Sequence, residues 1–377
     1  MTEQGVLKSL ERLSLQCMGC ALVLALVACE DKPKETKSSD AGASPKAAVD
    51  PDLAEAVEAA GQKAKADGGV PVGDGPPEKG VFAPGKADLQ LKAGEAPKIA
   101  LGDSGVSPRT SLTSSIVPGW KQSGSLDVTL RLGRAQFPEI SVALALEAPK
   151  PKAPAPAAPG AAPAPAAAPQ TSGLGTPVNA QVTDVKLKSD AGAQGKDLAR
   201  ELVKLKGSRV GFQVVAGGVA TDFTQELAKG APVDLELVLR AVSEALESSA
   251  VGFPKEEVGV GGYWLVTTRG IVGGAEVISY RLVKLEKMDG DQLTLSVNTK
   301  RYAVSQKLAL VGLPPGAELD QFQSTTDGKL TLQKGDPLAS GGSTKQTFLA
   351  ALTPAGGGDQ RLAVQSVADV TIAFGKK

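Results

Sequence analysis

Two stretches in the first half of the chain alternate between apolar and polar or small residues. Residues 126–132 (Leu-Asp-Val-Thr-Leu-Arg-Leu) and 140–147 (Ile-Ser-Val-Ala-Leu-Ala-Leu-Glu) each place an apolar side chain at every second position. Because successive side chains of a strand point to opposite faces, both stretches predict β-strands with one face on a core. Gly133 and Pro138 lie between them and favour an antiparallel pair. Shorter strands are expected at residues 89–92 and 99–101.

The same alternation dominates the chain from Tyr263 onward and predicts a β-meander. The expected strands there are residues 264–268, 276–286, 293–297, 319–325, 329–332, 344–353 and 361–374. An Asp-Gly pair is a strong hairpin signal, so turns are expected at Asp289-Gly290 and at Asp327-Gly328. Upstream, residues 178–187 alternate in the same way. Residues 209–223 predict a hairpin that turns at Gly217-Gly218.

Helical spacing of apolar residues appears in two places. Residues 197–206 predict a short amphipathic helix that Asp197 caps and Gly207 ends. The stronger helix, residues 233–247, follows Pro232 and repeats leucine and valine every three or four positions. Its carboxylates, Glu236, Glu244 and Glu247, are interpreted as a solvent-facing side.

Two segments are too poor in large apolar residues to form a core. Residues 29–84 combine Lys, Glu, Ser, Ala, Gly and Pro, which predicts a flexible tether. Residues 149–177 are a Pro/Ala run, which predicts a disordered insertion or linker. Residues 85–148 are marginal as an independent domain, so one β body with an inserted loop is favoured over two separate domains. The strands of residues 85–148 would then share this body with residues 178–377.

Together these patterns predict an α+β fold. We expect a large curved antiparallel β-sheet, a meander of half-barrel-like shape, with one main helix packed on its concave side.

The N-terminal segment, residues 1–28, ends in a run of about a dozen apolar residues, well short of the roughly 20 that span a bilayer as a helix. The run closes on Leu26-Val27-Ala28-Cys29, and the chain then turns polar at Glu30. This resembles the lipobox of a bacterial lipoprotein signal peptide. The resemblance implies cleavage between Ala28 and Cys29 and acylation of Cys29. A cleaved signal without lipid and a buried apolar helix are the alternatives.

A second resemblance concerns residues 253–264, in which Phe253-Pro254 and spaced glycines lead to Tyr263-Trp264. Together with the anchor and tether, this segment is similar to β-rich bacterial envelope lipoproteins of uncharacterised function. Phe253, Tyr263 and Trp264 are interpreted as core residues, and they are also where a ligand groove is expected if one exists.

Composition excludes several functional classes. The chain contains no histidine, which removes Ser-His-Asp and Cys-His catalysis and the commonest zinc ligand. Its formal net charge is zero and its aromatic content is 3%, so neither a basic field nor a stacking platform favours nucleic acid. No catalytic residue, metal site or cofactor is predicted.

Two functions remain as expectations. The first is a non-enzymatic structural or interaction role in the bacterial cell envelope. The body would be anchored in a membrane by acyl chains, face the periplasm or exterior, and contact other envelope proteins. The alternative is a carrier that holds a hydrophobic ligand, such as an acyl chain, in a groove of the curved sheet. A histidine-free hydrolase would need a cleft with paired carboxylates.

Overall fold

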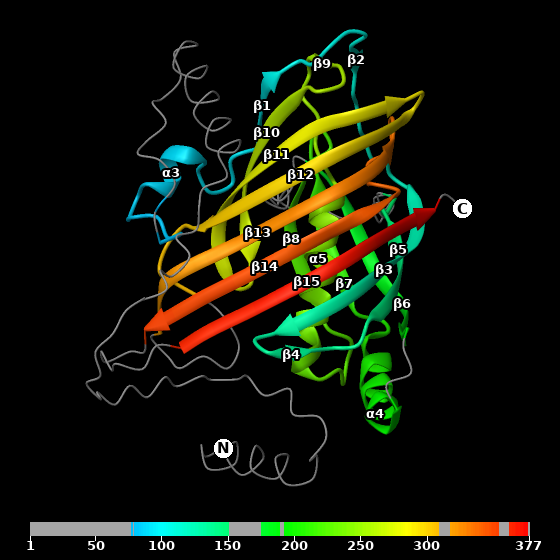
Figure 1. The fold of residues 1–377 in the computed structure, drawn as a ribbon, viewed down its shortest axis with the longest axis vertical. Helices are drawn as coiled ribbons and strands as arrows, with labels where there is room; N and C mark the ends of the chain where they lie inside the picture. Colours follow the sequence, from blue (N-terminus) through cyan, green and yellow to red (C-terminus); the bar gives the residue numbers. More distant parts are fainter. Residues whose placement is uncertain are drawn as a thin grey trace, which may run out of the picture.

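The computed structural model describes residue 77 and residues 79–150, 175–188, 192–308, 317–353 and 362–375, without the side chains of residues 192–194 (Figure 1). The predicted tether lies almost entirely outside these residues, and so does most of the Pro/Ala-rich insertion. The described part of the chain is β-rich, with few helices and one large antiparallel sheet. No helix in the described ranges is both long and apolar enough to cross a membrane.

The large sheet contains 13 strands, in the order β1-β10-β11-β12-β13-β14-β15-β3-β5-β6-β7-β8, with β4 paired to β3 outside this path. Its first seven members along this order are β1 (Lys98–Asp103), β10 (Tyr263–Val272), β11 (Ala275–Asp289), β12 (Gln292–Ala303), β13 (Glu318–Gln333), β14 (Gly341–Thr353) and β15 (Leu362–Gly375). The others are β3 (Lys121–Leu132), β4 (Ala135–Gln136), β5 (Ile140–Glu147), β6 (Thr176–Leu187), β7 (Arg209–Val214) and β8 (Ala220–Glu226).

The remaining elements are short, apart from one helix. They are α3 (Ala87–Gln90), α4 (Gly192–Leu202), the 3-10 turns η1 (Val203–Leu205) and η2 (Val233–Leu235), α5 (Glu236–Ser249), and the pair β2 (Thr110–Ser111) and β9 (Glu257–Val258). The helix predicted at residues 233–247 is thus confirmed as η2 and α5. The hairpin at Gly217-Gly218 is confirmed as β7 and β8. Asp197, however, lies inside α4 and pairs with Arg200 at 2.8 Å instead of capping the helix.

Two strand predictions are wrong. Residues 89–92 do not form a strand, because residues 87–90 are helical in α3. The expected turn at Asp327-Gly328 lies inside β13, which continues from Glu318 to Gln333 between β12 and β14. Asp327 accepts a hydrogen bond of 2.6 Å from the Asn298 side chain on β12, so an Asp-Gly pair is accommodated by its cross-strand neighbours.

Strands on either side of residues 151–174 belong to one sheet. β5 and β6 are antiparallel neighbours, with Glu147 opposite Asn179 in the register. β15, at the end of the described chain, pairs with β3, which precedes the insertion. The pair β3 and β5 thus has a strand from the later part of the chain on each side: β15 next to β3, and β6 next to β5.

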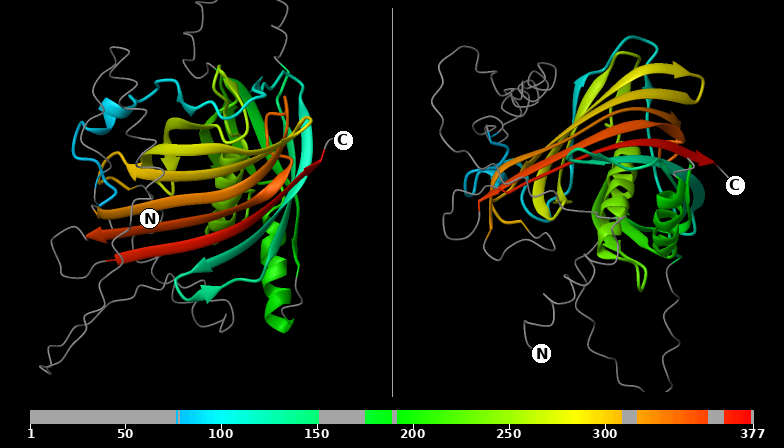
Figure 2. Two further views of the ribbon diagram at one scale, coloured as in Figure 1. Left: turned by 45° about the horizontal axis from the view of Figure 1, so that its top comes forward. Right: turned by 60° about the horizontal axis from the view of Figure 1, so that its bottom comes forward.

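The sheet is curved, and α5 lies on its concave side (Figure 2). Along each strand of the meander, the side chains on this inner face change from apolar to polar and back to apolar, so that three bands cross the strands. An apolar cluster that includes Leu293, Leu295 and Leu330 packs around α5, and a second cluster that includes Phe322, Phe348 and Leu352 fills the other end. Between the two clusters lies a buried polar belt, made of Ser279, Arg281, Thr299, Arg301, Ser324, Thr326, Thr344 and Gln346.

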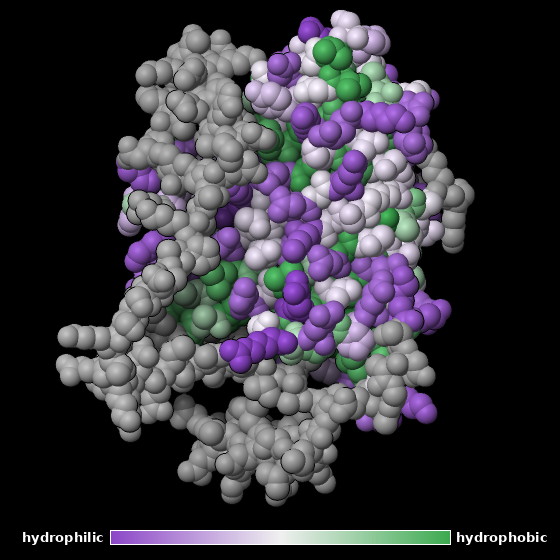
Figure 3. All heavy atoms as spheres, in the orientation of Figure 1, coloured by the Kyte–Doolittle hydropathy of each residue, from purple (hydrophilic) through white to green (hydrophobic). Residues whose placement is uncertain are grey.

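The outer face of the meander is mainly polar. Over β12 to β15 the surface in Figure 3 is mostly hydrophilic or neutral. Where apolar side chains do point outward on β10 and β11, the segment around α3 covers them: Phe82 and Leu91 pack against Ile278 and Tyr280. The sheet therefore buries one face throughout and a second face only locally.

Candidate functional site

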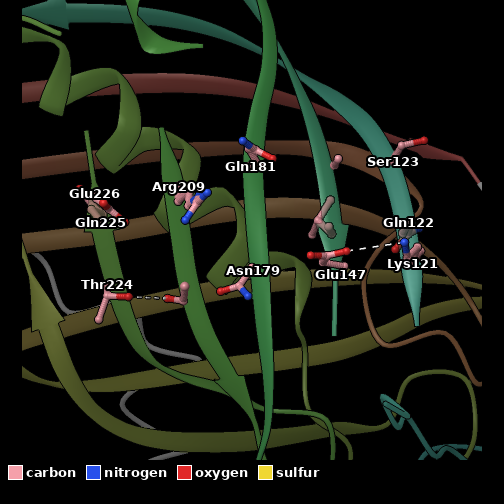
Figure 4. A pocket seen from close by; sticks show the side chains of 13 residues that line it. Lys121, Gln122, Ser123, Glu147, Asn179, Gln181, Arg209, Thr224, Gln225 and Glu226 are labelled. Atoms are coloured by element: carbon pink, nitrogen blue, oxygen red, sulfur yellow. Dashed lines mark hydrogen bonds and ion pairs between the residues drawn. The ribbon is translucent and has the colours of Figure 1, made fainter. Parts of the chain in front are cut away.

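A groove crosses the solvent-facing side of five strands, β3, β5, β6, β7 and β8. Its volume is about 620 Å³, which lies within the range of roughly 300–1,000 Å³ typical of ligand sites. Figure 4 shows its side chains standing on adjacent strands. These strands follow one another along the chain, and their antiparallel register brings their outward positions into line.

The groove is built from two rows of register partners. The first row consists of Ser123, Ala145, Gln181, Arg209 and Glu226, and the second of Lys121, Glu147, Asn179, Gly211 and Thr224. Each row takes one residue from each strand, in sheet order. The first row is charged only at the β7–β8 end and the second row only at the β3–β5 end, so the two charged pairs lie at opposite ends of the groove.

Gly211 shows why small residues are needed on the groove floor. A Cβ atom at this position would lie 2.7 Å from the Thr224 hydroxyl. The hydroxyl instead donates a hydrogen bond of 3.4 Å to the Gly211 carbonyl. Gly211, Ala145 and Ser123 have small side chains or none, so they leave open space between the longer side chains that line the groove.

Each end of the groove carries one cation and one anion. At the β3–β5 end, Lys121 and Glu147 are 3.7 Å apart, and both side chains are more than half exposed, at 75% and 54%. At the β7–β8 end, Arg209 and Glu226 are register partners but form no ion pair within the described part of the chain. An exposed ion pair contributes little to stability, so exchanging the contact between Lys121 and Glu147 for contacts with a ligand would cost little free energy.

Amide side chains provide hydrogen-bonding capacity along the groove. Asn179 and Gln181 stand on β6 in its middle (Figure 4). Gln122 alternates with Lys121 and Ser123 on β3, so its buried side chain, whose Oε1 atom has no hydrogen-bond partner, points to the inner face of the sheet and not into the groove. The amide groups that face the groove are therefore those of Asn179 and Gln181.

The aromatic residues predicted for a ligand groove lie elsewhere. Phe253 and Trp264 are buried, with ring centroids 5.8 Å apart, and the Trp264 indole donates a hydrogen bond of 2.9 Å to the Gly252 carbonyl. Tyr263 points to the opposite side of β10, where its ring lies over Gly102. The three residues therefore do not meet in one cavity, and the groove of β3 to β8 contains none of them.

A second polar site is buried beneath α5. The carboxylate of Glu247 accepts hydrogen bonds from Arg281 at 3.0 Å and from Arg301 at 2.9 Å. Arg281 also donates to the Ala250 carbonyl at 2.9 Å, and Arg301 to the Thr326 hydroxyl at 3.0 Å. These bonds join the C-terminal half of α5 to the polar belt on β11, β12 and β13.

The two carboxyl groups of this region differ in their pKa. Burial raises the pKa of Glu247, but the charges and hydrogen bonds of Arg301 and Arg281 outweigh it, so the net pKa is below the ordinary value. Burial raises the pKa of Glu244, and the more distant charges of Arg301 and Arg240 only partly oppose this rise. Glu247 is therefore held as the anion, and the proton on Glu244 is favoured.

The prediction that Glu236, Glu244 and Glu247 share a solvent-facing side is wrong for two of the three. Glu236 is exposed in the first turn of α5, whereas Glu244 and Glu247 are 7% and 8% exposed. The inner face of the sheet surrounds the helix from β8 to β13, so the polar side of α5 is buried as well. The missed signal is a pair of arginines on neighbouring strands: Arg281 lies within the predicted strand 276–286, and Arg301 continues the two-residue period of the predicted strand 293–297 beyond its expected end.

The inner side of the sheet has little free space beside this cluster. A cavity of about 40 Å³ lies between β8 and β10 over Glu244 and Glu247, and one of about 20 Å³ lies beside Arg240. Neither approaches the size of a ligand chamber. No group of three potential metal ligands occurs among the described residues.

Cys29 and Ala28, the predicted acylation and cleavage positions, lie outside the described residues. The sequence of the whole chain matches no model of a known protein family, and no curated protein matches it.

Proposed function

We propose that this protein is a lipid-anchored lipoprotein of the bacterial cell envelope whose body has a non-enzymatic structural or interaction role. The observation that carries the proposal is the apolar run that ends in Leu26-Val27-Ala28-Cys29 and is followed at once by Glu30. Acyl chains on Cys29 would hold the body at a membrane, since more than one chain gives stable anchoring.

The body supports an interaction role through its outer surface. The groove of β3 to β8 is open to solvent and carries charged and amide side chains. The inner side, by contrast, is occupied by α5, two apolar clusters and the polar belt. Its cavities of about 20 and 40 Å³ are too small for an acyl chain, so they give the carrier alternative no support.

The test is metabolic labelling of the full chain in a bacterial host with an alkyne analogue of palmitate. The wild-type protein should carry the label and sediment with membranes, and Cys29→Ser should lose both properties. Cys20→Ser is the matched control, because it removes another thiol of the same segment, and it should be labelled like the wild type. Labelling of Cys29→Ser would overturn the proposal.

A further inference from the structure

We propose that the groove of β3 to β8 binds a short zwitterionic peptide, one that carries free carboxylate and ammonium groups like the peptide side chains of a cell-wall polymer. This inference rests on the proposed envelope function and names a partner for it. Its support comes from the placement of charges, the size of the groove and the nature of its lining.

The charge pattern favours a ligand that also carries both signs. Lys121 and Glu147 lie at one end, and Arg209 and Glu226 lie at the other. A polyanion such as nucleic acid would meet two carboxylates together with the two cations, which removes the electrostatic gain of binding phosphate. A zwitterionic peptide can pair its carboxylates with Lys121 or Arg209 and its ammonium groups with Glu147 or Glu226.

The dimensions fit a peptide of a few residues. Neighbouring strands lie about 4.8 Å apart, so the path from β3 to β8 spans roughly 19 Å. An extended chain rises about 3.3 Å per residue, so roughly five or six residues cover this path. A ligand of that length reaches both charged ends of the groove. A tripeptide with a γ-linked glutamate and a terminal diaminopimelate has about as many chain atoms, roughly 15, as five α-linked residues and covers a similar path.

The lining favours peptide groups over sugar rings. No aromatic side chain is among the residues that line the groove, so the C–H face of a sugar ring has no aromatic surface to pack against there. Asn179 and Gln181 offer both donors and acceptors to a peptide backbone, and the low floor at Gly211 allows close approach.

The experiment measures binding of the full chain, purified in detergent, to a fluorescent tripeptide of L-Ala, γ-linked D-Glu and meso-diaminopimelate. Saturable binding is expected, and Arg209→Gln and Glu226→Gln should each weaken it on the order of tenfold, because each removes one charge-assisted contact. Arg131→Gln is the matched control: Arg131 is an exposed arginine on β3 that does not line the groove. Its affinity should equal that of the wild type.

Three results would overturn the inference. They are absence of tripeptide binding, equal losses in Arg131→Gln and Arg209→Gln, and saturable binding of an N-acetylglucosamine oligomer without binding of the tripeptide. Thermal midpoints of all variants should agree within a few degrees, since these are surface substitutions. Loss of palmitate labelling in Cys29→Ser together with absent tripeptide binding would leave the envelope function standing and remove only this partner.

Discussion

Glu247 on α5 and Arg301 on β12 are joined by a hydrogen bond of 2.9 Å in the interior, although 54 positions separate them in the chain. The Arg301 side chain is completely buried, and the Glu247 side chain is 11% exposed. Arg281 completes the cluster from the neighbouring strand. A helix and two strands thus depend on one carboxylate for their charge balance.

Glu247→Gln should therefore be strongly destabilising. The substitution leaves Arg281 and Arg301 buried without their counter-charge, which costs about 3–5 kcal/mol in comparable buried pairs. Urea denaturation followed by circular dichroism measures the change in free energy of unfolding. Glu236→Gln, at an exposed position of the same helix, should change it by no more than about 0.5 kcal/mol. Equal effects of the two substitutions would contradict the assigned role of Glu247.

Glu244 should make the protein less stable as the pH rises. Burial raises its pKa above the ordinary value of 4.5, so above pH 4.5 the folded state keeps a proton that the unfolded state loses. The free energy of unfolding therefore falls from pH 4.5 up to the folded pKa. Glu247 has the opposite sign: its pKa is lowered, so its contribution is present above pH 4.5 and is lost as the pH falls through its folded pKa.

Glu244→Gln separates these two effects. The variant keeps the Glu247 contribution and lacks the Glu244 titration, so its stability relative to the wild type should increase from pH 4.5 upward and then level off. Urea denaturation at intervals between pH 4 and 8 measures the difference. Two curves that stay parallel across this range would show that Glu244 has the same pKa in both states.

The strands were predictable where apolar residues fill the inward positions. β3 and β5 follow their period-two patterns closely, and the meander was expected from Tyr263 onward. The limits of β12 were not predictable, because Thr299 and Arg301 occupy inward positions and end the apolar alternation at Val297. β13 was predicted as two strands for a related reason: Ser324 and Thr326 point inward just before Asp327-Gly328, which is itself a strong turn signal.

The groove could not be predicted from the sequence. Its rows join residues between Lys121 and Glu226 that become neighbours only through the register of five strands. No local motif marks Gln181 opposite Arg209, because each is an ordinary outward position of its own strand. The aromatic residues Phe253 and Trp264 were a stronger local signal for a ligand site. Their large apolar side chains are instead buried in the core, where such side chains are most often found.

Trp264→Phe should be destabilising even though the replacement is also aromatic. The indole donates to the buried Gly252 carbonyl, so phenylalanine leaves that acceptor without its partner and removes packed volume. A loss of about 1–3 kcal/mol in the free energy of unfolding is expected. Trp120→Phe is the matched control, since Trp120 is only partly buried at the edge of the same core. If Trp120→Phe lowered the free energy of unfolding by as much, the effect of Trp264→Phe would come from the lost indole volume and not from the hydrogen bond.

Replacing residues 151–174 with a short Gly-Ser link should leave the fold intact, because β5 and β6 are already antiparallel neighbours at the two ends of this segment. Each halving of a loop reduces its closure cost by about 0.6 kcal/mol, so the variant should be slightly more stable than the wild type. Its affinity for the zwitterionic tripeptide should not change, since every residue that lines the groove lies outside the deleted segment. A single unfolding transition at or above the wild-type midpoint is the expected calorimetric result. Two separate transitions, or loss of the folded state, would show that the strands before and after the segment do not fold as one sheet.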